Sequence, residues 1–137
     1  MEIIIETPKW SFIKYKFVGG SFVRSLVSPF PTLYNYGFAV GSVGGDGQPQ
    51  DVLVLGRRLP AGTRLNANIL GYVQFQDKGL EDNKLICVPS GRISLADRLM
   101  IDMFFRAYSL FKRAYYLFKY SKSVGCSYNG VILYNSK

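Results

Sequence analysis

Histidine is absent from the 137-residue sequence, and cysteine occurs only twice. Without histidine, mechanisms that need an imidazole base and most zinc sites are excluded. Any metal would be held by oxygen ligands, which points to Mg²⁺, Mn²⁺ or Ca²⁺. Two cysteines cannot build a disulfide framework. We expect Cys87, in an apolar run, in the core, and Cys126, in a Gly/Ser/Asn-rich stretch, in a loop.

Long apolar runs are also lacking, since no stretch approaches the ~20 residues that a membrane-spanning helix needs. Residues 1–6 have neither the basic start of a secretory signal nor the Arg/Ser-rich character of a transit peptide. We therefore expect no membrane span. The expected location is a mitochondrial or other organellar matrix, or otherwise the cytoplasm.

Acidic residues are scarce, with nine Asp and Glu against 17 Lys and Arg, for a formal net charge of +8. After Pro89, eight basic residues meet only Asp97 and Asp102. The length predicts a single domain, 1–137. Within it, the charge distribution separates a nearly neutral body, 1–89, from a basic helical module and tail, 90–137. The excess charge is typical of a solvated helix face or of a surface that binds RNA or another polyanion.

Short aromatic and β-branched stretches with partial alternation fill residues 1–89 and predict strands, with a hairpin turn at Gly19-Gly20. After Pro89 the apolar residues recur at helical spacing, and Ser94 with Asp97 forms a capping-box pattern. One or two helices are expected over about 94–120. The pattern predicts a mainly β fold with flanking helix, of the small closed-barrel kind.

The few carboxylates of the body are not spread evenly along it. Five of its seven acids fall at the end of a predicted strand or in the loop beside one: Glu6, Asp46, Asp51, Asp77 and Asp82. Each one alone is typical of a turn cap. As a set they favour an oxygen-ligand cup for a metal ion.

Four stretches, in order and spacing, resemble the soluble (family I) inorganic pyrophosphatases. They are Ile5-Glu6-Thr7-Pro8 with Lys14-Tyr15, Asn35-Tyr36-Gly37-Phe38, Asp46-Gly47-Gln48-Pro49-Gln50-Asp51, and the run from Asp77 to Leu85 with its end at Val88-Pro89. The resemblance covers about residues 3–118. It implies a five-stranded OB-like barrel with one or two C-terminal helices, and Mg²⁺-dependent hydrolysis of pyrophosphate to two phosphates.

The resemblance also implies roles for individual residues. The implied metal ligands are Glu6, Asp46, Asp51, Asp77 and Asp82. The implied phosphate-binding groups are Lys14, Arg24, Lys84 and Tyr36. The resemblance also implies catalytic roles for Tyr36 and Tyr108. Carboxylates bind hard cations, lysine and arginine bind phosphate, and clustered metals lower the pKa of a bridging water.

Three departures from the family pattern predict weakened chemistry. Gln48 stands where the resemblance implies the aspartate that takes a proton from water, and an amide cannot act as that base. Lys16 stands where an acid is expected, and Ser109 where a lysine is expected.

These departures lead us to expect a degenerate member. It would be a pseudoenzyme that serves as a non-catalytic structural subunit of a larger assembly, such as an organellar ribosome or other ribonucleoprotein. Protein subunits, and RNA through the basic module, would be its partners. The alternative is an active but slow Mg²⁺-dependent pyrophosphatase. A third possibility is an unrelated OB-fold nucleic-acid binder.

Overall fold

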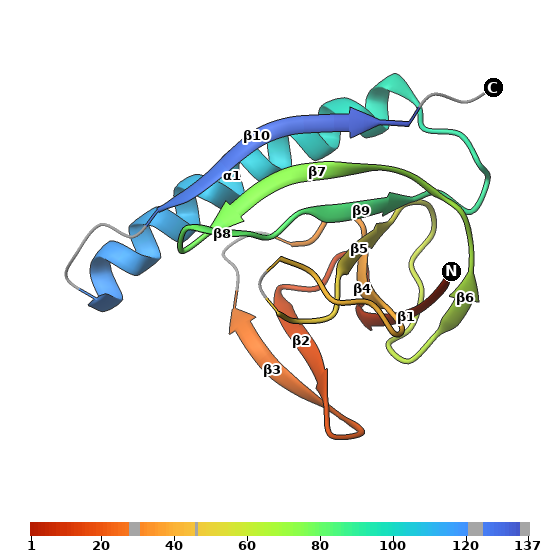
Figure 1. Cartoon of the computed structure of the whole chain (residues 1–137), viewed down its shortest axis with the longest axis horizontal. Helices are drawn as coiled ribbons and strands as arrows, with labels where there is room; N and C mark the ends of the chain where they lie inside the picture. Colours follow the sequence, from red (N-terminus) through yellow and green to blue (C-terminus); the bar gives the residue numbers. More distant parts are fainter. Residues whose placement is uncertain (28–30, 46, 121–124, 135–137) are drawn as a thin grey trace.

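The computed structural model describes residues 1–27, 31–45, 47–120 and 125–134. Over these ranges the chain forms ten strands and one helix (Figure 1). The strands are β1 (Glu2–Thr7), β2 (Ile13–Val18), β3 (Ser21–Val27), β4 (Asn35–Ala39), β5 (Asp51–Val54), β6 (Arg64–Asn66), β7 (Ile69–Asp77), β8 (Leu80–Glu81), β9 (Lys84–Cys87) and β10 (Cys126–Leu133), and the helix is α1 (Leu95–Tyr120).

Eight strands share one sheet, in the order β10-β7-β9-β5-β4-β1-β6, with β8 paired to β7. All pairings are antiparallel except that of β5 with β9, which sets Val52 beside Leu85. The starts of these two strands therefore lie side by side, which places Asp51 next to Lys84. The sheet order thus brings together two residues that are 33 positions apart in the sequence.

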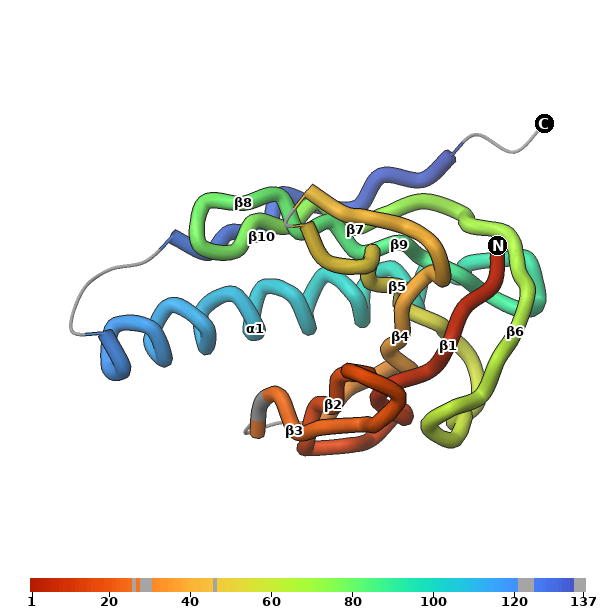
Figure 2. The backbone as a smooth tube through the Cα atoms, turned by 60° about the horizontal axis from the view of Figure 1, so that its bottom comes forward, coloured from red at the N-terminus to blue at the C-terminus, as the bar shows by residue number. Residues whose placement is uncertain are grey.

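The hairpin of β2 and β3 forms a separate two-stranded sheet. Its turn residues Gly19 and Gly20 have φ angles of 57° and 84°, which glycine adopts without steric cost. The predicted hairpin is confirmed. Figure 2 shows it on one side of α1, with β7, β8 and β10 on the other side.

Two glycines allow strands to approach closely. A Cβ atom on Gly37 would lie 2.3 Å from the carbonyl oxygen of Ile4, and one on Gly71 would lie 2.2 Å from that of Ile132. Any side chain at these positions would push β4 from β1, or β7 from β10. Gly37 directly follows Tyr36, so it also fixes the position of a predicted site residue.

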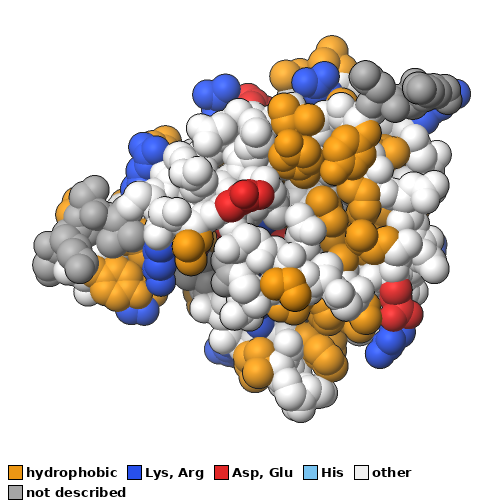
Figure 3. All heavy atoms as spheres, in the orientation of Figure 1, with side chains coloured by type: hydrophobic (Ala, Val, Ile, Leu, Met, Phe, Trp, Pro, Cys, Tyr) orange, Lys and Arg blue, Asp and Glu red, His pale blue; other side chains and the backbone are white. Residues whose placement is uncertain are grey.

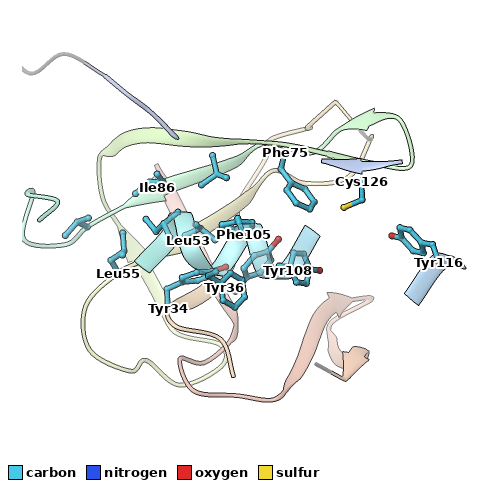
Figure 4. Packing of buried hydrophobic residues seen from close by; sticks show 14 residues of the cluster. Tyr34, Tyr36, Leu53, Leu55, Phe75, Ile86, Phe105, Tyr108, Tyr116 and Cys126 are labelled. Carbon is cyan, nitrogen blue, oxygen red and sulfur yellow. The ribbon is translucent and has the colours of Figure 1, made fainter. Parts of the chain in front are cut away.

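The helix α1 begins at the predicted capping box. The Asp97 amide donates to Ser94 Oγ at 3.0 Å, and the Ser94 amide donates to Asp97 Oδ2 at 3.2 Å. One continuous helix of 26 residues follows. Its inner face buries Ile101, Phe104 and Phe105 against the sheet. Figure 4 shows Phe105 and Tyr108 of α1 beside Tyr34, Tyr36 and Phe75 of the sheet side.

The predicted fold class is confirmed, since the described chain is mainly β with one C-terminal helix. The strands of the sheet outnumber the five that were expected. Cys126 corrects a second expectation, because it is buried at the start of β10 rather than in a loop. The reason is that β10 returns along β7 and carries Cys126 under α1. In the described residues, no helix is long and apolar enough to cross a membrane.

Candidate active site

A cavity of about 280 Å³ opens between the hairpin β2–β3, the segment from β7 to β9, and the C-terminal half of α1. It is lined mainly by lysine, tyrosine and aspartate. The lining residues are Lys14, Tyr15, Lys16, Ser25, Tyr36, Asp51, Asp77, Lys78, Asp82, Lys84, Tyr108, Lys112, Tyr115, Tyr116, Lys119 and Tyr120. Such a composition suits an anionic ligand.

The floor of this cavity is a hydrogen-bonded cluster of Tyr36, Asp51, Asp82 and Lys84, here called the floor cluster. Lys84 Nζ donates to Asp51 Oδ2 at 2.7 Å and to Asp82 Oδ2 at 2.6 Å. The Tyr36 hydroxyl donates to Asp51 Oδ2 at 2.8 Å. Tyr36, Asp51 and Lys84 are buried. Two carboxylates therefore already converge on one cation position.

Mutual attraction fixes the charges of the floor cluster. Burial alone would raise the pKa of Asp51, but Lys84 and Lys16 together hold this pKa below its ordinary value. Burial alone would lower the pKa of Lys84, but Asp51 and Asp82 raise it above its ordinary value. At neutral pH Asp51 is therefore a carboxylate and Lys84 an ammonium ion, and their opposite charges stabilise each other.

Lys14 is buried beside the floor cluster in a different environment. Its ammonium lies 4.0 Å from the ring centre of Tyr108 and 4.8 Å from that of Tyr36. Burial, followed by repulsion from Lys84 and Lys112, lowers the pKa of Lys14 to about 7. An anion entering the cavity would meet an ammonium group that is short of negative neighbours.

The outer end of the cavity holds a second group of side chains, here called the rim cluster: Lys78, Lys112, Tyr115, Tyr116, Lys119 and Tyr120. Asp77 anchors it, because Asp77 Oδ1 accepts from the Tyr116 hydroxyl at 2.6 Å and Asp77 Oδ2 lies 3.3 Å from Lys112 Nζ. The ammonium groups of Lys78, Lys112 and Lys119 also lie over tyrosine rings of the rim cluster.

A second cavity, of about 400 Å³, lies on the other side of Asp51. Glu6, Lys16 and Gln48 line it together with Asp51 and several apolar side chains. Burial raises the pKa of Glu6, although its carboxylate accepts a hydrogen bond from the Phe17 amide at 2.5 Å. Lys16 Nζ lies 3.7 Å from Asp51 Oδ1, so Asp51 has a lysine near each of its oxygens.

The structure brings most of the predicted site residues to these two cavities. The first holds Lys14, Tyr36, Asp51, Asp77, Asp82, Lys84 and Tyr108, and the second holds Glu6 and Gln48. Arg24 does not join them, since it is exposed on β3 and lines neither cavity. Asp46 lies outside the described residues.

Sequence reasoning missed the cations that α1 supplies. Ser109, where a lysine was expected, is buried and donates to the Arg106 carbonyl at 3.0 Å. Lys112 and Lys119 instead line the cavity. A helical periodicity signal was available, because Lys112, Tyr115 and Lys119 follow Tyr108 at i+4, i+7 and i+11, on one helix face.

The donor chemistry of the cavity fits a hard divalent cation. The charged side chains of the cavity that can bind a metal ion are all carboxylates. Two of them, Asp51 and Asp82, already share one cation, the ammonium of Lys84. Within the described ranges, no three acidic, cysteine or histidine side chains are close enough to form a metal site by themselves. A bound cation would therefore need oxygen ligands from a phosphate or from water as well.

The model of the family described as "Inorganic pyrophosphatase" matches residues 3–123 of the chain. The chain belongs to the family I inorganic pyrophosphatases. It is 34% identical over 101 residues to the inorganic pyrophosphatase of Gluconobacter oxydans, and the match covers 68% of this chain and 57% of that protein. It is 37% identical over 101 residues to that of Saccharolobus solfataricus, a match that covers 67% of this chain and 56% of that protein. The matched chain thus spans little more than half the length of these curated relatives.

Solved structures show the same relationship. An inorganic pyrophosphatase from Coxiella burnetii superposes with a TM-score of 0.75 at 26% identity, over 97% of this chain and 85% of that one. The pyrophosphatase of Thermus thermophilus has a TM-score of 0.79 over 97% of this chain and 82% of that one. At 21% identity, the latter shows the fold alone.

These matches overturn the expected function of a non-catalytic structural subunit of a ribosome or other ribonucleoprotein. That prediction is wrong, because relatives at 34% and 37% identity are inorganic pyrophosphatases. The physical reason lies in the site. Gln48 changes the second cavity and leaves the floor cluster intact, and Lys112 and Lys119 of the basic module line the first cavity.

Proposed function

We propose that the chain is an active Mg²⁺-dependent inorganic pyrophosphatase that hydrolyses pyrophosphate to two phosphate ions. The observation that carries this proposal is the floor cluster, in which Lys84 joins Asp51 and Asp82 at the base of a lysine-rich cavity. Its carboxylates suit a hard cation and its lysines suit phosphate oxygens.

In the first cavity Asp51 and Asp82 would hold Mg²⁺ together with oxygens of phosphate or water, and Asp77 would offer a separate carboxylate. Glu6 would do the same on the side of the second cavity. At these residues Mg²⁺ would supply neutralisation of phosphate charge and a lowered pKa for a coordinated water, which could then act as the nucleophile. The lysine contacts of Asp51 keep this carboxylate ionised, and a bound cation would compete with them for its oxygens.

Lys14, Lys84 and Lys112 would bind the phosphate oxygens of the substrate. Lys14 gains most from an anion, since burial and neighbouring lysines destabilise its charge in the free protein. Tyr36 keeps its proton, because burial and the negative charge of Asp51 raise its pKa well above the ordinary value. Its hydroxyl therefore serves as a hydrogen-bond donor.

Gln48 is the reason to expect slow hydrolysis of pyrophosphate. Its amide can orient a water molecule by hydrogen bonding but cannot take the proton that this water loses. The proton then leaves without help from this position. We therefore propose a slow enzyme, with metal activation of water retained and general-base assistance at residue 48 lost.

The proposal is tested by measuring phosphate release from pyrophosphate by the purified chain, with Mg²⁺ and with a chelator. We expect turnover that needs Mg²⁺ and that falls by at least about 10³-fold in Asp51→Asn, since both cavities lose a shared ligand. Glu2→Gln is the matched control, because Glu2 is an exposed acid on β1 outside both cavities. Equal loss in both variants would count against a specific role of Asp51.

We further propose that residues 1–137 form one pyrophosphatase-like domain. Protein and RNA partners stay a prediction that no relative named above supports. The same holds for an organellar location, because those relatives come from bacteria and an archaeon.

A further inference from the structure

Lys16 is a second lysine beside Asp51, on the side of the second cavity. Its Nζ lies 3.7 Å from Asp51 Oδ1, while Lys84 Nζ donates to Asp51 Oδ2 at 2.7 Å. Asp51 lines both cavities, and so does Lys16. Asp51 therefore separates the two cavities with an ammonium group near each of its oxygens.

The two lysines are held in different ways. The Lys84 side chain is 5% exposed and donates hydrogen bonds to two carboxylates. The Lys16 side chain is 43% exposed, and its distance of 3.7 Å from Asp51 Oδ1 exceeds hydrogen-bond length. Water can solvate an exposed ammonium group that leaves its partner, so such an ion pair exchanges at low cost. Lys84 is thus fixed in the floor cluster, whereas Lys16 can leave Asp51.

The backbone on each side of Lys16 is fixed to the end of β1. The Tyr15 amide donates to Thr7 Oγ1 at 2.9 Å, and the Phe17 amide donates to Glu6 Oε2 at 2.5 Å. These two hydrogen bonds set the position of the Lys16 Cα atom, so only the side chain decides where the ammonium group lies. The place of Lys16 between the two cavities is therefore a property of the fold.

Glu6 gives the second cavity another carboxylate besides Asp51. Glu6 is buried, and burial raises its pKa, whereas the hydrogen bond from the Phe17 amide and the charge of Lys16 lower it. The Lys16 ammonium group therefore acts on Glu6 as well as on Asp51. Two carboxylates and one ammonium group thus repeat the arrangement of the floor cluster on the other side of Asp51. The ammonium group of the second cavity is the one that can exchange.

We propose that Lys16 is a built-in counter-ion of the second cavity, and that a divalent cation binds beside Asp51 and Glu6 only by displacing its ammonium group. A divalent ion carries twice the charge of an ammonium group and coordinates carboxylate oxygens directly, so it replaces Lys16 once its concentration is high enough. Lys16 thereby sets the metal concentration that this side of the site needs. The inference rests on the proposed function, because that function supplies the divalent ion.

The test is a titration of the whole chain with Mn²⁺ in place of Mg²⁺ and without substrate, in which electron paramagnetic resonance measures the free Mn²⁺. We expect Lys16→Gln to bind Mn²⁺ about tenfold more tightly than the wild-type chain, because a positive charge next to the ion is removed. Lys16→Glu supplies a further carboxylate and should bind Mn²⁺ at least as tightly as Lys16→Gln. Thermal melting checks that both variants fold.

Arg64→Gln is the matched control, because it removes the same charge from the same cavity. Arg64 lines the second cavity, but its guanidinium group pairs with Glu2 at 3.5 Å. This variant should change the Mn²⁺ dissociation constant by less than about twofold. Wild-type affinity in Lys16→Gln, or an equal gain in Arg64→Gln, would overturn the proposal. Absence of Mn²⁺ binding from the wild-type chain and all variants would overturn it too.

Binding and hydrolysis are measured separately, which keeps this inference apart from the proposed function. Pyrophosphate hydrolysis by the wild-type chain, with unchanged Mn²⁺ affinity in Lys16→Gln, would leave the proposed function standing and remove the role of Lys16. Tighter Mn²⁺ binding in Lys16→Gln without any hydrolysis would do the reverse. Weaker pyrophosphate binding in Lys16→Gln at unchanged Mn²⁺ affinity would make Lys16 a phosphate ligand and overturn the proposal.

Discussion

The two ends of one cavity treat their lysines in opposite ways. At the floor, Lys84 is buried and hydrogen-bonded to two carboxylates at 2.7 and 2.6 Å. At the rim, Lys78 and Lys119 lie over tyrosine rings at distances above 5 Å. On the face seen in Figure 3, which has the orientation of Figure 1, Lys and Arg side chains lie in small separate groups around a hydrophobic band and form no broad basic surface.

The floor and the rim show two ways in which a chain with few acids can position cations for an anion. Carboxylates lie at the floor, because a buried ammonium group without an anionic partner would lose its charge. At the solvent-exposed rim, rings suffice to position cations, because water supplies the solvation. Removing a floor cation should therefore lower the unfolding free energy of the protein. Removing a rim cation should change anion binding and leave the unfolding free energy nearly unchanged.

Lys84→Met should have the largest effect. It leaves Asp51 buried without its main cation, which costs about 3–5 kcal/mol of unfolding free energy, and it should abolish pyrophosphate hydrolysis. Lys78→Met, at the rim, should change the unfolding free energy by less than about 0.5 kcal/mol. Urea denaturation measures both values, and similar losses in the two variants would break the distinction between floor and rim.

Gln48→Asp tests whether the site is complete apart from the proton acceptor expected at position 48. A carboxylate there restores a general base, so kcat for pyrophosphate hydrolysis should rise by about 10²-fold. Asn129→Asp adds the same charge at an exposed position on β10 and should leave kcat unchanged. A kcat for Gln48→Asp that matches the wild type would show that Lys16, or another departure, limits the reaction instead.

Lys14 makes stability depend on pH in a predictable direction. Burial, then repulsion from Lys84 and Lys112, lowers its pKa to about 7 in the folded chain, whereas the unfolded chain keeps a pKa near ~10.4. Between these values the unfolded state binds more protons, so the unfolding free energy rises with pH, by up to about 1.4 kcal/mol per unit. Below pH about 7 both states are protonated and this dependence disappears.

Urea denaturation at pH 6, 7, 8 and 9 checks the Lys14 effect against Lys14→Met, in which the extra slope above pH 7 should vanish. The variant removes the titrating group while other groups titrate as before. A slope that is identical in the two proteins would show that Lys14 is paired with an anion in the free protein.

The smallest effects concern two neighbouring tyrosines of the core. Over the described residues, the buried Tyr34 hydroxyl has no hydrogen-bond partner, whereas that of Tyr36 donates to Asp51. Tyr34→Phe should therefore raise the unfolding free energy by about 1 kcal/mol, and Tyr36→Phe should lower it by about 1–2 kcal/mol. Thermal melting compares the pair, and destabilisation by Tyr34→Phe would reveal a bound water at its hydroxyl.

Local signals in the sequence predicted the features that depend on neighbours along the chain. Gly19-Gly20 gives the hairpin its turn, and Ser94 with Asp97 caps α1. The acids beside predicted strands indicated a carboxylate cup, and the family resemblance added Lys84. Asp51 and Lys84 meet because they start β5 and β9, which pair in parallel.

Features that depend on docking between elements could not be predicted in the same way. The sequence shows that Lys112 and Lys119 share a helix face, but only the packing of α1 beside β7 aims this face at the cavity. The position of Lys16 near Asp51 depends on how the hairpin β2–β3 folds back. Gln48 was predicted as the lost base, yet its place in a neighbouring cavity was not.

Hydrolysis of pyrophosphate by the floor cluster can be followed by phosphorus NMR, which observes substrate and product in one sample of chain, pyrophosphate and Mg²⁺. We expect the pyrophosphate signal to be converted slowly to phosphate, and Gln48→Asp to accelerate the conversion. A pyrophosphate signal that persists in both proteins as long as in a protein-free sample would contradict this expectation.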